Sequence, residues 1–243
     1  MALPPARLHL VKNLLLVPTH LELTLVHEFL PTWNVSSGHA DGEPDFPDIV
    51  VQVCGFGLVA AAAQSARLIT QFAPQRIWLL GIAGSYRNAA DIGQAMCFRQ
   101  VVCHGIGVGS GDQFQSVERL GWMHWTGNQH GEAIGDRIGL AGTPIENSAE
   151  LAEWQHTLLS VAAASQDAND VGLRKKFCPE AIAEDMEGFA VAVASRLEQL
   201  PLTIIRGISN VAGDRNKANW KVRPAMQSAV KLFHQLLLQS EFD

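Results

Sequence analysis

The sequence predicts an α/β fold, a three-layer αβα sandwich whose central sheet is mostly parallel or mixed. Short apolar runs alternate along the chain with longer segments of helical periodicity. The apolar runs are β-branched or Leu-rich and are bounded by Gly, Pro or polar residues, as expected of strands that are buried on both faces. No repeat and no inter-domain linker interrupts the 243 residues. Residues 1–243 are therefore expected to form one domain.

The apolar runs that are predicted as buried strands lie at Leu14–Val17, Ile49–Val53, Ile77–Leu80, Ala95–Val102, Leu158–Ala164 and Leu202–Ile208. Within 181–192 a further strand is expected to end and a helix to begin. Helices are predicted over Leu58–Phe72, which stops before Pro74, over Gly188–Leu200 and over Ala225–Leu238. Thr32–Pro47 is predicted to be an excursion between strands, and Gly105–Asn147 a long loop that is functional or disordered.

The composition narrows the classes of ligand. Eighteen Lys+Arg against 24 Asp+Glu give a net charge of −6, and no basic stripe is interleaved with aromatic residues. This argues against nucleic-acid or anionic-membrane binding and leaves free nucleosides as ligands. No apolar stretch approaches membrane-spanning length, so a cytoplasmic protein is expected. The four cysteines, Cys54, Cys97, Cys103 and Cys178, occur singly and are expected to be reduced core thiols.

A glycine turn after the second predicted strand matches the pattern of a dinucleotide-binding site. Gly55-Phe56-Gly57-Leu58-Val59-Ala60 fits G-x-G-x-x-A at the start of a helix. A nicotinamide cofactor also needs an acidic residue on the next strand for its ribose, but 77–80 runs into Gly81-Ile82-Ala83-Gly84 without one. A tight strand-to-helix turn is favoured instead, and no organic cofactor is predicted. The histidines show no metal-ligand spacing, so no metal is predicted either.

Three polar positions next to predicted strands each allow two interpretations. In the run 181–192, the structural interpretation is that Asp185 caps the helix and Glu187 complements the helix dipole. The functional interpretation is that Glu187 accepts hydrogen bonds from a diol such as that of ribose. Asn210, after the strand 202–208, forms a turn with its own backbone or faces a ligand. Glu22 is a solvated acid at a helix start or orients a water. These alternatives stay open from the residues alone.

In this order, the motifs resemble those of the nucleoside phosphorylase and nucleosidase superfamily. The landmarks are the Gly55 turn with its Ala-rich helix, Gly81-Ile82-Ala83-Gly84, Asp185-Met186-Glu187-Gly188 and Arg206-Gly207-Ile208-Ser209-Asn210. Within the superfamily, the chain most resembles futalosine hydrolases. That likeness rests on residues 81–86, on Asp112-Gln113-Phe114 with Glu118-Arg119-Leu120-Gly121, and on Asn210, Asp214-Arg215-Asn216 and Trp220.

The resemblance implies a nucleosidase that hydrolyses the ribosyl–purine bond, releasing hypoxanthine from futalosine in menaquinone biosynthesis. By position, the catalytic residues would be Glu22, which activates the attacking water, Glu187, which binds the ribose diol, and Asn210, which contacts the base. Substrate-binding roles would fall to Ile82, Ala83, Gly84, Met186 and Asp214. The resemblance implies a homo-oligomer, a dimer or larger, without metal or cofactor.

Two departures from neighbouring groups separate the alternatives. Nucleoside phosphorylases carry an Arg before the second glycine turn and a Gly-x-Pro-x-Arg near the N-terminus, whereas this chain has Leu79-Leu80 and Val17-Pro18-Thr19-His20. Methylthioadenosine/adenosylhomocysteine nucleosidases have an Asp at the position of Asn210, which protonates adenine; an amide suits a 6-oxopurine better. The remaining alternatives are these two activities and a nucleoside-binding protein without turnover, for which a water-orienting Glu22 would be superfluous.

Overall fold

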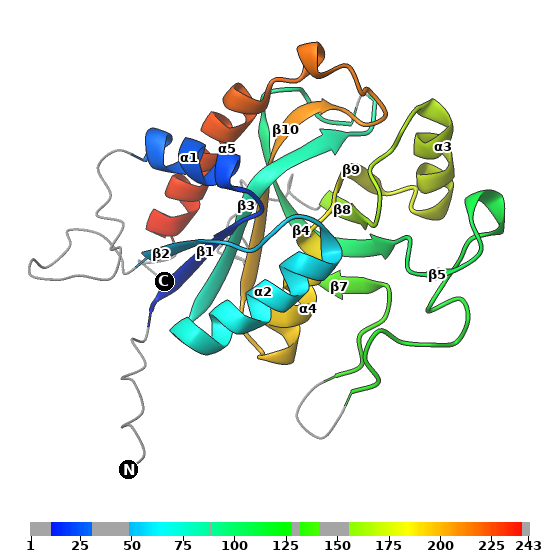
Figure 1. The fold of residues 1–243 in the computed structure, drawn as a ribbon, viewed down its shortest axis with the longest axis horizontal. Helices are drawn as coiled ribbons and strands as arrows, with labels where there is room; N and C mark the ends of the chain where they lie inside the picture. The colour runs from blue at the N-terminus through cyan, green and yellow to red at the C-terminus, as the bar shows by residue number, and fades with distance from the viewer. Residues whose placement is uncertain (1–10, 31–48, 88, 128–131, 141–155, 240–243) are drawn as a thin grey trace, which may run out of the picture.

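The computed structural model describes residues 11–30, 49–87, 89–127, 132–140 and 156–239, and it has the predicted α/β architecture (Figure 1). Its strands are β1 (Asn13–Val17), β2 (Ile49–Val53), β3 (Arg76–Ser85), β4 (Ala95–His104), β5 (Gly107–Val108), β6 (Gln115–Ser116), β7 (Arg137–Gly139), β8 (His156–Val161), β9 (Ala181–Asp185) and β10 (Leu202–Val211). Its α-helices are α1 (His20–Phe29), α2 (Gly57–Phe72), α3 (Ala168–Phe177), α4 (Gly188–Leu197) and α5 (Val222–Gln239).

The central sheet is mixed, as predicted, and has the order β10-β4-β8-β9-β3-β1-β2, with β7 on β4. Parallel pairs join β1 to β2 and to β3, β3 to β10, β4 to β8 and β8 to β9. Antiparallel pairs join β10 to β4, β3 to β9 and β4 to β7. The carboxyl ends of β1, β3 and β10 therefore lie at the same edge of the sheet.

One part of the sheet closes on itself, which the predicted sandwich does not include. Strand β10 pairs with β3 as well as with β4, so β3, β10, β4, β8 and β9 form a ring. Closure is possible because β3 and β10 are each 10 residues long. Strand β3 pairs with β10 along most of its length and reaches β9 with its last two residues, Gly84 and Ser85. Long strands twist and coil enough to make this turn.

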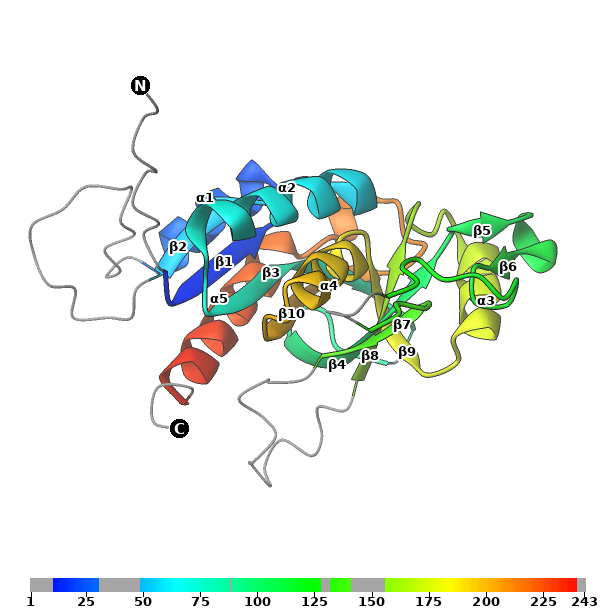
Figure 2. The same cartoon turned by 90° about the horizontal axis from the view of Figure 1, so that it is seen from below.

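Helices cover both faces of the sheet, α1 and α5 on one and α2 and α4 on the other (Figures 1 and 2). The strand β1 shows why its sequence is apolar throughout. Leu14 and Leu16 pack in the cluster under α2 and α4, while Leu15 and Val17 pack in the cluster under α1 and α5. Each such side chain contributes about 2 kcal/mol when it is fully buried. The four cysteines are buried and unpaired, as predicted.

Several boundaries differ from the predictions. Strands β3 and β10 extend beyond the predicted ends, to Ser85 and Val211, whereas β8 ends at Val161 instead of Ala164. The predicted loop Gly105–Asn147 contains a small hairpin of β5 and β6 and the strand β7, which pairs with β4. The predicted excursion Thr32–Pro47 lies outside the described residues. Within the described part of the chain, no helix is both long enough and apolar enough to cross a membrane.

Candidate active site

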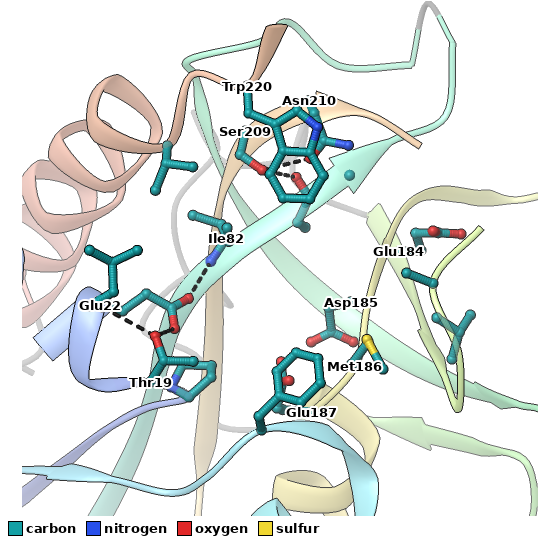
Figure 3. Close-up of a pocket in the computed structure, with 18 of the residues that line it drawn as sticks. Thr19, Glu22, Ile82, Glu184, Asp185, Met186, Glu187, Ser209, Asn210 and Trp220 are labelled. Atoms are coloured by element: carbon teal, nitrogen blue, oxygen red, sulfur yellow. Dashed lines mark hydrogen bonds between the residues drawn. The ribbon is translucent and has the colours of Figure 1, made fainter. Parts of the chain in front are cut away.

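A cavity of about 240 Å³ opens at the carboxyl ends of β1, β3, β8, β9 and β10. Seven of the eight predicted site residues line it, namely Glu22, Ile82, Ala83, Gly84, Met186, Glu187 and Asn210. Figure 3 shows Glu22 on one side of the cavity, Met186 and Glu187 on the other, and Asn210 with Trp220 above them. Asp214 is not among the lining residues. The fold therefore joins four segments that are separate in the sequence.

Glu22 lies in the first turn of α1, directly after β1. The helix begins at Thr19, whose hydroxyl accepts a hydrogen bond from Glu22 N at 3.3 Å and donates one to Glu22 Oε2 at 2.7 Å. The other carboxylate oxygen, Oε1, accepts from Ile82 N at 3.1 Å. Burial raises the pKa of Glu22, although the Thr19 hydroxyl and the positive charge of Arg206 oppose the shift. Glu22 is thus a fixed, partly desolvated carboxyl group.

Gly81 makes room for Glu22 and Arg206. A Cβ on Gly81 would lie 2.1 Å from Arg206 Nη1 and 2.8 Å from Glu22 Oε1. These two side-chain atoms therefore flank one point in the backbone of β3. No side chain larger than hydrogen fits there unless one of the two groups moves.

Replacing Gly81 with Ala is expected to lower the free energy of unfolding by about 1–3 kcal/mol, because the added methyl group overpacks a buried charged site. Urea unfolding followed by circular dichroism measures the change. Gly172→Ala in α3 is the matched control, since a Cβ there meets no atom within 4 Å. Equal midpoints for the two variants would show that the site tolerates the extra carbon.

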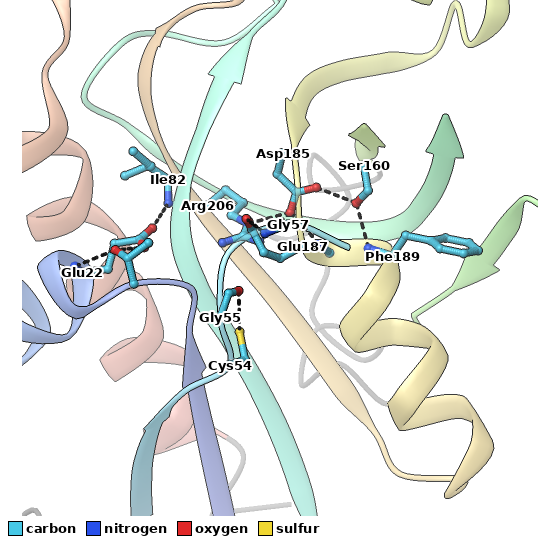
Figure 4. Close-up of polar contacts among 12 residues, drawn as sticks. Glu22, Cys54, Gly55, Gly57, Ile82, Ser160, Asp185, Glu187, Phe189 and Arg206 are labelled. Carbon is cyan, nitrogen blue, oxygen red and sulfur yellow. Dashed lines mark hydrogen bonds and ion pairs between the residues drawn. The ribbon is translucent and has the colours of Figure 1, made fainter. Parts of the chain in front are cut away.

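Arg206 ties the two acidic residues of the β9–α4 junction together (Figure 4). Its Nε and Nη2 lie 3.0 and 2.5 Å from Asp185 Oδ2, and Nη2 lies 3.4 Å from Glu187 Oε2. Asp185 also accepts from Gly188 N, the first N–H of α4, at 2.8 Å and from Ser160 Oγ at 2.5 Å. The predicted cap is not Asp185, because the N-cap residue of α4 is Glu187, whose side chain makes no capping hydrogen bond. Arg206 Nη1 makes no hydrogen bond to any described residue.

Glu187 faces the cavity from the junction between β9 and α4. Its Oε1 accepts a hydrogen bond of 3.0 Å from Gly57 N, the first residue of α2. Gly55 and Gly57 have positive φ angles of 93° and 78°, which glycine adopts readily, so the predicted turn is present. Burial raises the pKa of Glu187 to about 7, with Arg206 opposing and Asp185 adding to the shift. The carboxyl group therefore changes charge near neutral pH.

Asn210 and Ser209 are neighbours in β10, yet both line the cavity. Consecutive residues of a regular strand point to opposite faces. Here the register of β10 against β3 shifts between Ile208 and Asn210, and this bulge turns both side chains to one side. Asn210 Oδ1 accepts from Ser209 Oγ at 2.8 Å, and Nδ2 donates to Val211 O at 2.8 Å. Nδ2 keeps a second N–H for a ligand.

Asp214 organises the loop after β10 instead of lining the cavity. Its carboxylate accepts from Asn216 N at 2.9 Å and from Asn219 Nδ2 at 2.8 Å. Its backbone oxygen accepts from the indole N–H of Trp220 at 3.0 Å. The predicted substrate-binding role of Asp214 gains no support from this geometry.

The positions of two site residues, Glu22 and Arg206, could also have been predicted from local features of the sequence. Thr19-His20-Leu21-Glu22 has the T-x-x-E spacing of a capping box, which predicts the start of α1 and fixes Glu22 beside Thr19. Arg206 is a lone charge in an apolar strand, and a charged residue there requires a buried partner. Phe56, which also lines the cavity, had no such signal.

The glycine turn before α2 is occupied by a side chain of the protein itself. Among the described residues, no three His, Cys, Asp or Glu side chains gather as metal ligands would. The N-terminal amide of α2, at Gly57, is engaged by Glu187. The carboxylate thus occupies the position at which a dinucleotide fold would bind pyrophosphate.

Comparisons with known proteins show what the chain is similar to. A family model described as "Phosphorylase superfamily" matches residues 5–240. A futalosine hydrolase of Streptomyces coelicolor is 27% identical over 148 residues, 60% of this chain and 58% of that protein. A 5'-methylthioadenosine/S-adenosylhomocysteine nucleosidase of Hydrogenovibrio crunogenus is 25% identical over 183 residues, 74% of this chain and 75% of that protein. The crystal structure of such a nucleosidase from Neisseria meningitidis, in complex with methylthio-immucillin-A, superposes with a TM-score of 0.74 at 19% identity, covering 95% of this chain and 100% of that one.

Proposed function

The chain belongs to the phosphorylase superfamily, and from this premise we propose that it hydrolyses the N-glycosidic bond of a purine nucleoside. The observation that carries the proposal is the placement of two buried carboxyl groups, Glu22 and Glu187, on opposite sides of one cavity with the amide of Asn210 above them (Figure 3). One carboxylate can activate water and the other can stabilise the sugar. The amide can contact the base.

Water, not phosphate, is the proposed acceptor. A phosphate dianion needs a cationic clamp. Arg206 is fully buried, and two of its nitrogens already serve Asp185 and Glu187. Four carboxylate residues line the cavity, namely Glu22, Glu184, Asp185 and Glu187. The negative charge of these carboxylates would repel a phosphate dianion, so a phosphorolytic activity is not favoured.

Glu22 is proposed as the general base. The attacking water is proposed to lie beside Glu22 Oε1 and Arg206 Nη1, the two atoms that flank Gly81. Arg206 Nη1 is a buried donor that needs an acceptor, and a water oxygen supplies one. As this oxygen bonds to C1′, its proton passes to Glu22. The raised pKa of Glu22 makes it a stronger base than a solvated carboxylate.

Glu187 is proposed to bind the ribose 2′,3′-diol and to stabilise the positive charge that the sugar gains as the C1′–N9 bond breaks. In a site sheltered from water, a fixed carboxylate stabilises an oxocarbenium-like transition state strongly. Its contacts with Gly57 N and Arg206 hold it in place. Met186, the preceding residue, packs against the sugar.

Asn210 is proposed to receive the base. The bond electrons leave with the purine, and the free N–H of Asn210 Nδ2 stabilises that charge at N7. An amide has no acidic proton to give, so the base takes its proton from solvent. An amide N–H fits a 6-oxopurine, whose N7 and O6 both accept hydrogen bonds. Hypoxanthine is therefore the proposed product, and futalosine the proposed substrate.

Methylthioadenosine or adenosylhomocysteine is the second candidate substrate. The similarity to the Hydrogenovibrio nucleosidase favours it, because that match spans more of this chain than the match to the futalosine hydrolase does. The identities of both are low, and Asn210 decides between them in our proposal.

The substrate is tested by incubating the protein with futalosine, inosine, methylthioadenosine and adenosylhomocysteine and identifying the released base by chromatography. We expect hypoxanthine from futalosine at a higher kcat/KM than adenine from either thionucleoside. Faster release of adenine would keep the reaction and overturn the assignment of Asn210. If no substrate releases a base, the hydrolase proposal fails.

Replacing Asn210 with Asp is expected to shift the ratio of kcat/KM for adenine nucleosides over 6-oxopurine nucleosides by at least about tenfold, since a protonated Asp can donate to N7 of adenine. Asn210→Ala is the control, because it removes the amide without adding an acid. Initial rates with methylthioadenosine and inosine measure the ratio. If the Asp and Ala variants show the same ratio, the amide does not select the base.

The pH profile follows from the same residues. The pKa of Glu187 lies near 7, so the group is neutral below that pH and loses its attraction for the sugar cation. The raised pKa of Glu22 acts in the same direction, since the protonated base cannot take a proton from water. We therefore expect kcat/KM to be high above about pH 7 and to fall below it. A flat profile between about pH 5 and 8 would contradict both roles.

A further inference from the structure

The mouth of the cavity carries a cationic side chain for which the proposed reaction has no use. Arg215 is the one basic residue among the described residues that line the cavity. It is exposed and forms no ion pair with any residue in the described part of the chain. Its guanidinium carbon lies 5.4 Å from the ring centroid of Trp220, which lines the same cavity. A free guanidinium on an aromatic platform is suited to an anion.

The segment that carries Arg215 is held in place by several hydrogen bonds. Asp214 accepts from Asn216 N and Asn219 Nδ2, and its backbone oxygen holds the indole of Trp220. The backbone N–H of Lys221 returns to Ser209 O at 2.7 Å. These bonds connect Arg215 and Trp220 to the bulge of β10 that positions Asn210. A ligand bound by Asn210 therefore meets Arg215 in a defined place.

The exposure of the lining residues distinguishes a buried end of the cavity from an open end. Glu22, Glu187 and Asn210 are only 4%, 4% and 7% exposed, whereas Phe56, which also lines the cavity, is 65% exposed. The deep end is acidic and the open end carries Arg215. In the proposed pose, C1′ and the base lie near Glu22 and Asn210, and the diol lies near Glu187. The remaining ribose substituent, at C5′, is the one that extends toward the mouth.

We propose that Arg215, supported by Trp220, binds an anionic group at the end of the 5′ substituent of the nucleoside. This inference rests on the proposed function and adds to it a specificity-determining residue, which recognises a 5′ extension that ends in a carboxylate or a phosphate. A neutral nucleoside fills only the deep part of the cavity. The aromatic faces of Phe56 and Trp220 favour an extension with a flat apolar portion before the anion.

The test compares four nucleosides: futalosine, its carboxylate methyl ester, inosine 5′-monophosphate and inosine. For Arg215→Met we expect KM to rise about tenfold for the preferred anionic substrate, with kcat nearly unchanged. KM for inosine and for the ester should stay within about twofold, and Arg215→Lys should recover part of the loss. Lys217→Met is the matched control, because Lys217 is exposed in the same loop and does not line the cavity.

The outcomes identify the bound anion and decide whether Arg215 binds it. A higher wild-type kcat/KM for futalosine than for inosine 5′-monophosphate identifies the anion as a carboxylate, and the reverse identifies a phosphate. An unchanged KM for both anions in Arg215→Met, or an equal rise for inosine, overturns the proposal. If the wild-type protein releases no base from any of the four, the hydrolase proposal fails separately. The ligands then stay intact, and calorimetric Kd values for the same variants give the same comparison.

Discussion

Replacing Glu22 with Gln is expected to lower kcat for base release by about 10²–10⁴-fold, with a much smaller effect on KM. The amide keeps the size of the side chain but cannot take a proton from water. The carboxylate is held from two sides, by the Thr19 hydroxyl and by Ile82 N. The loss should therefore fall on the chemical step instead of on binding.

Glu28→Gln is the matched control, since Glu28 lies on the same helix, is exposed and pairs with Arg223 at the surface. It should leave kcat unchanged. Steady-state rates with futalosine measure both variants, and circular dichroism shows whether each is folded. A folded Glu22→Gln protein that retains most of its kcat would show that Glu22 is not the base.

Replacing Arg206 with Met should have the largest effect on stability, a loss of about 3–5 kcal/mol in the free energy of unfolding. The side chains of Arg206 and Asp185 are 0% exposed and that of Glu187 is 5% exposed. Without the guanidinium, two buried carboxyl groups lose the positive charge between them. One of them must take up a proton for the protein to fold.

Arg223→Met is the control for Arg206→Met, because it breaks an exposed ion pair with Glu28 and should cost far less stability. Urea unfolding at neutral pH measures both. The Arg206→Met protein should also regain stability relative to the wild type as the pH falls, since protonation removes the unpaired negative charge. Similar losses for the two variants would mean that the buried cluster contributes no more than a surface pair.

The strands next to the site were predictable because they are apolar on both faces. The range Ile49–Val53 matches β2, and Leu14–Val17 differs from β1 by one residue. The end of β8 was predicted too late, because Ala162, Ala163 and Ala164 continue the apolar run although the strand has ended. Helix α3 escaped prediction, since its start depends on the side chain of Asp167, which accepts from Asn169 N and Asp170 N.

The site was predictable as a set of residue types but not as a geometry. From the residues alone, Glu22, Glu187 and Asn210 each had a structural interpretation of equal or greater weight. The functional interpretation gains support because β1, β9 and β10 bring the three residues to one cavity. This convergence cannot be seen in the local sequence around any one of them. The bulge that turns Ser209 and Asn210 the same way arises from the pairing of β10 with β3 and has no local signal.

In the proposed reaction, water attacks the sugar at this site. The most direct test is to let the protein act on futalosine in saturating inorganic phosphate and to identify the sugar product by mass spectrometry and ³¹P NMR. We expect the free sugar and hypoxanthine, at a rate that phosphate does not raise. A sugar 1-phosphate, or a rate that requires phosphate, would contradict the account and make the protein a phosphorylase.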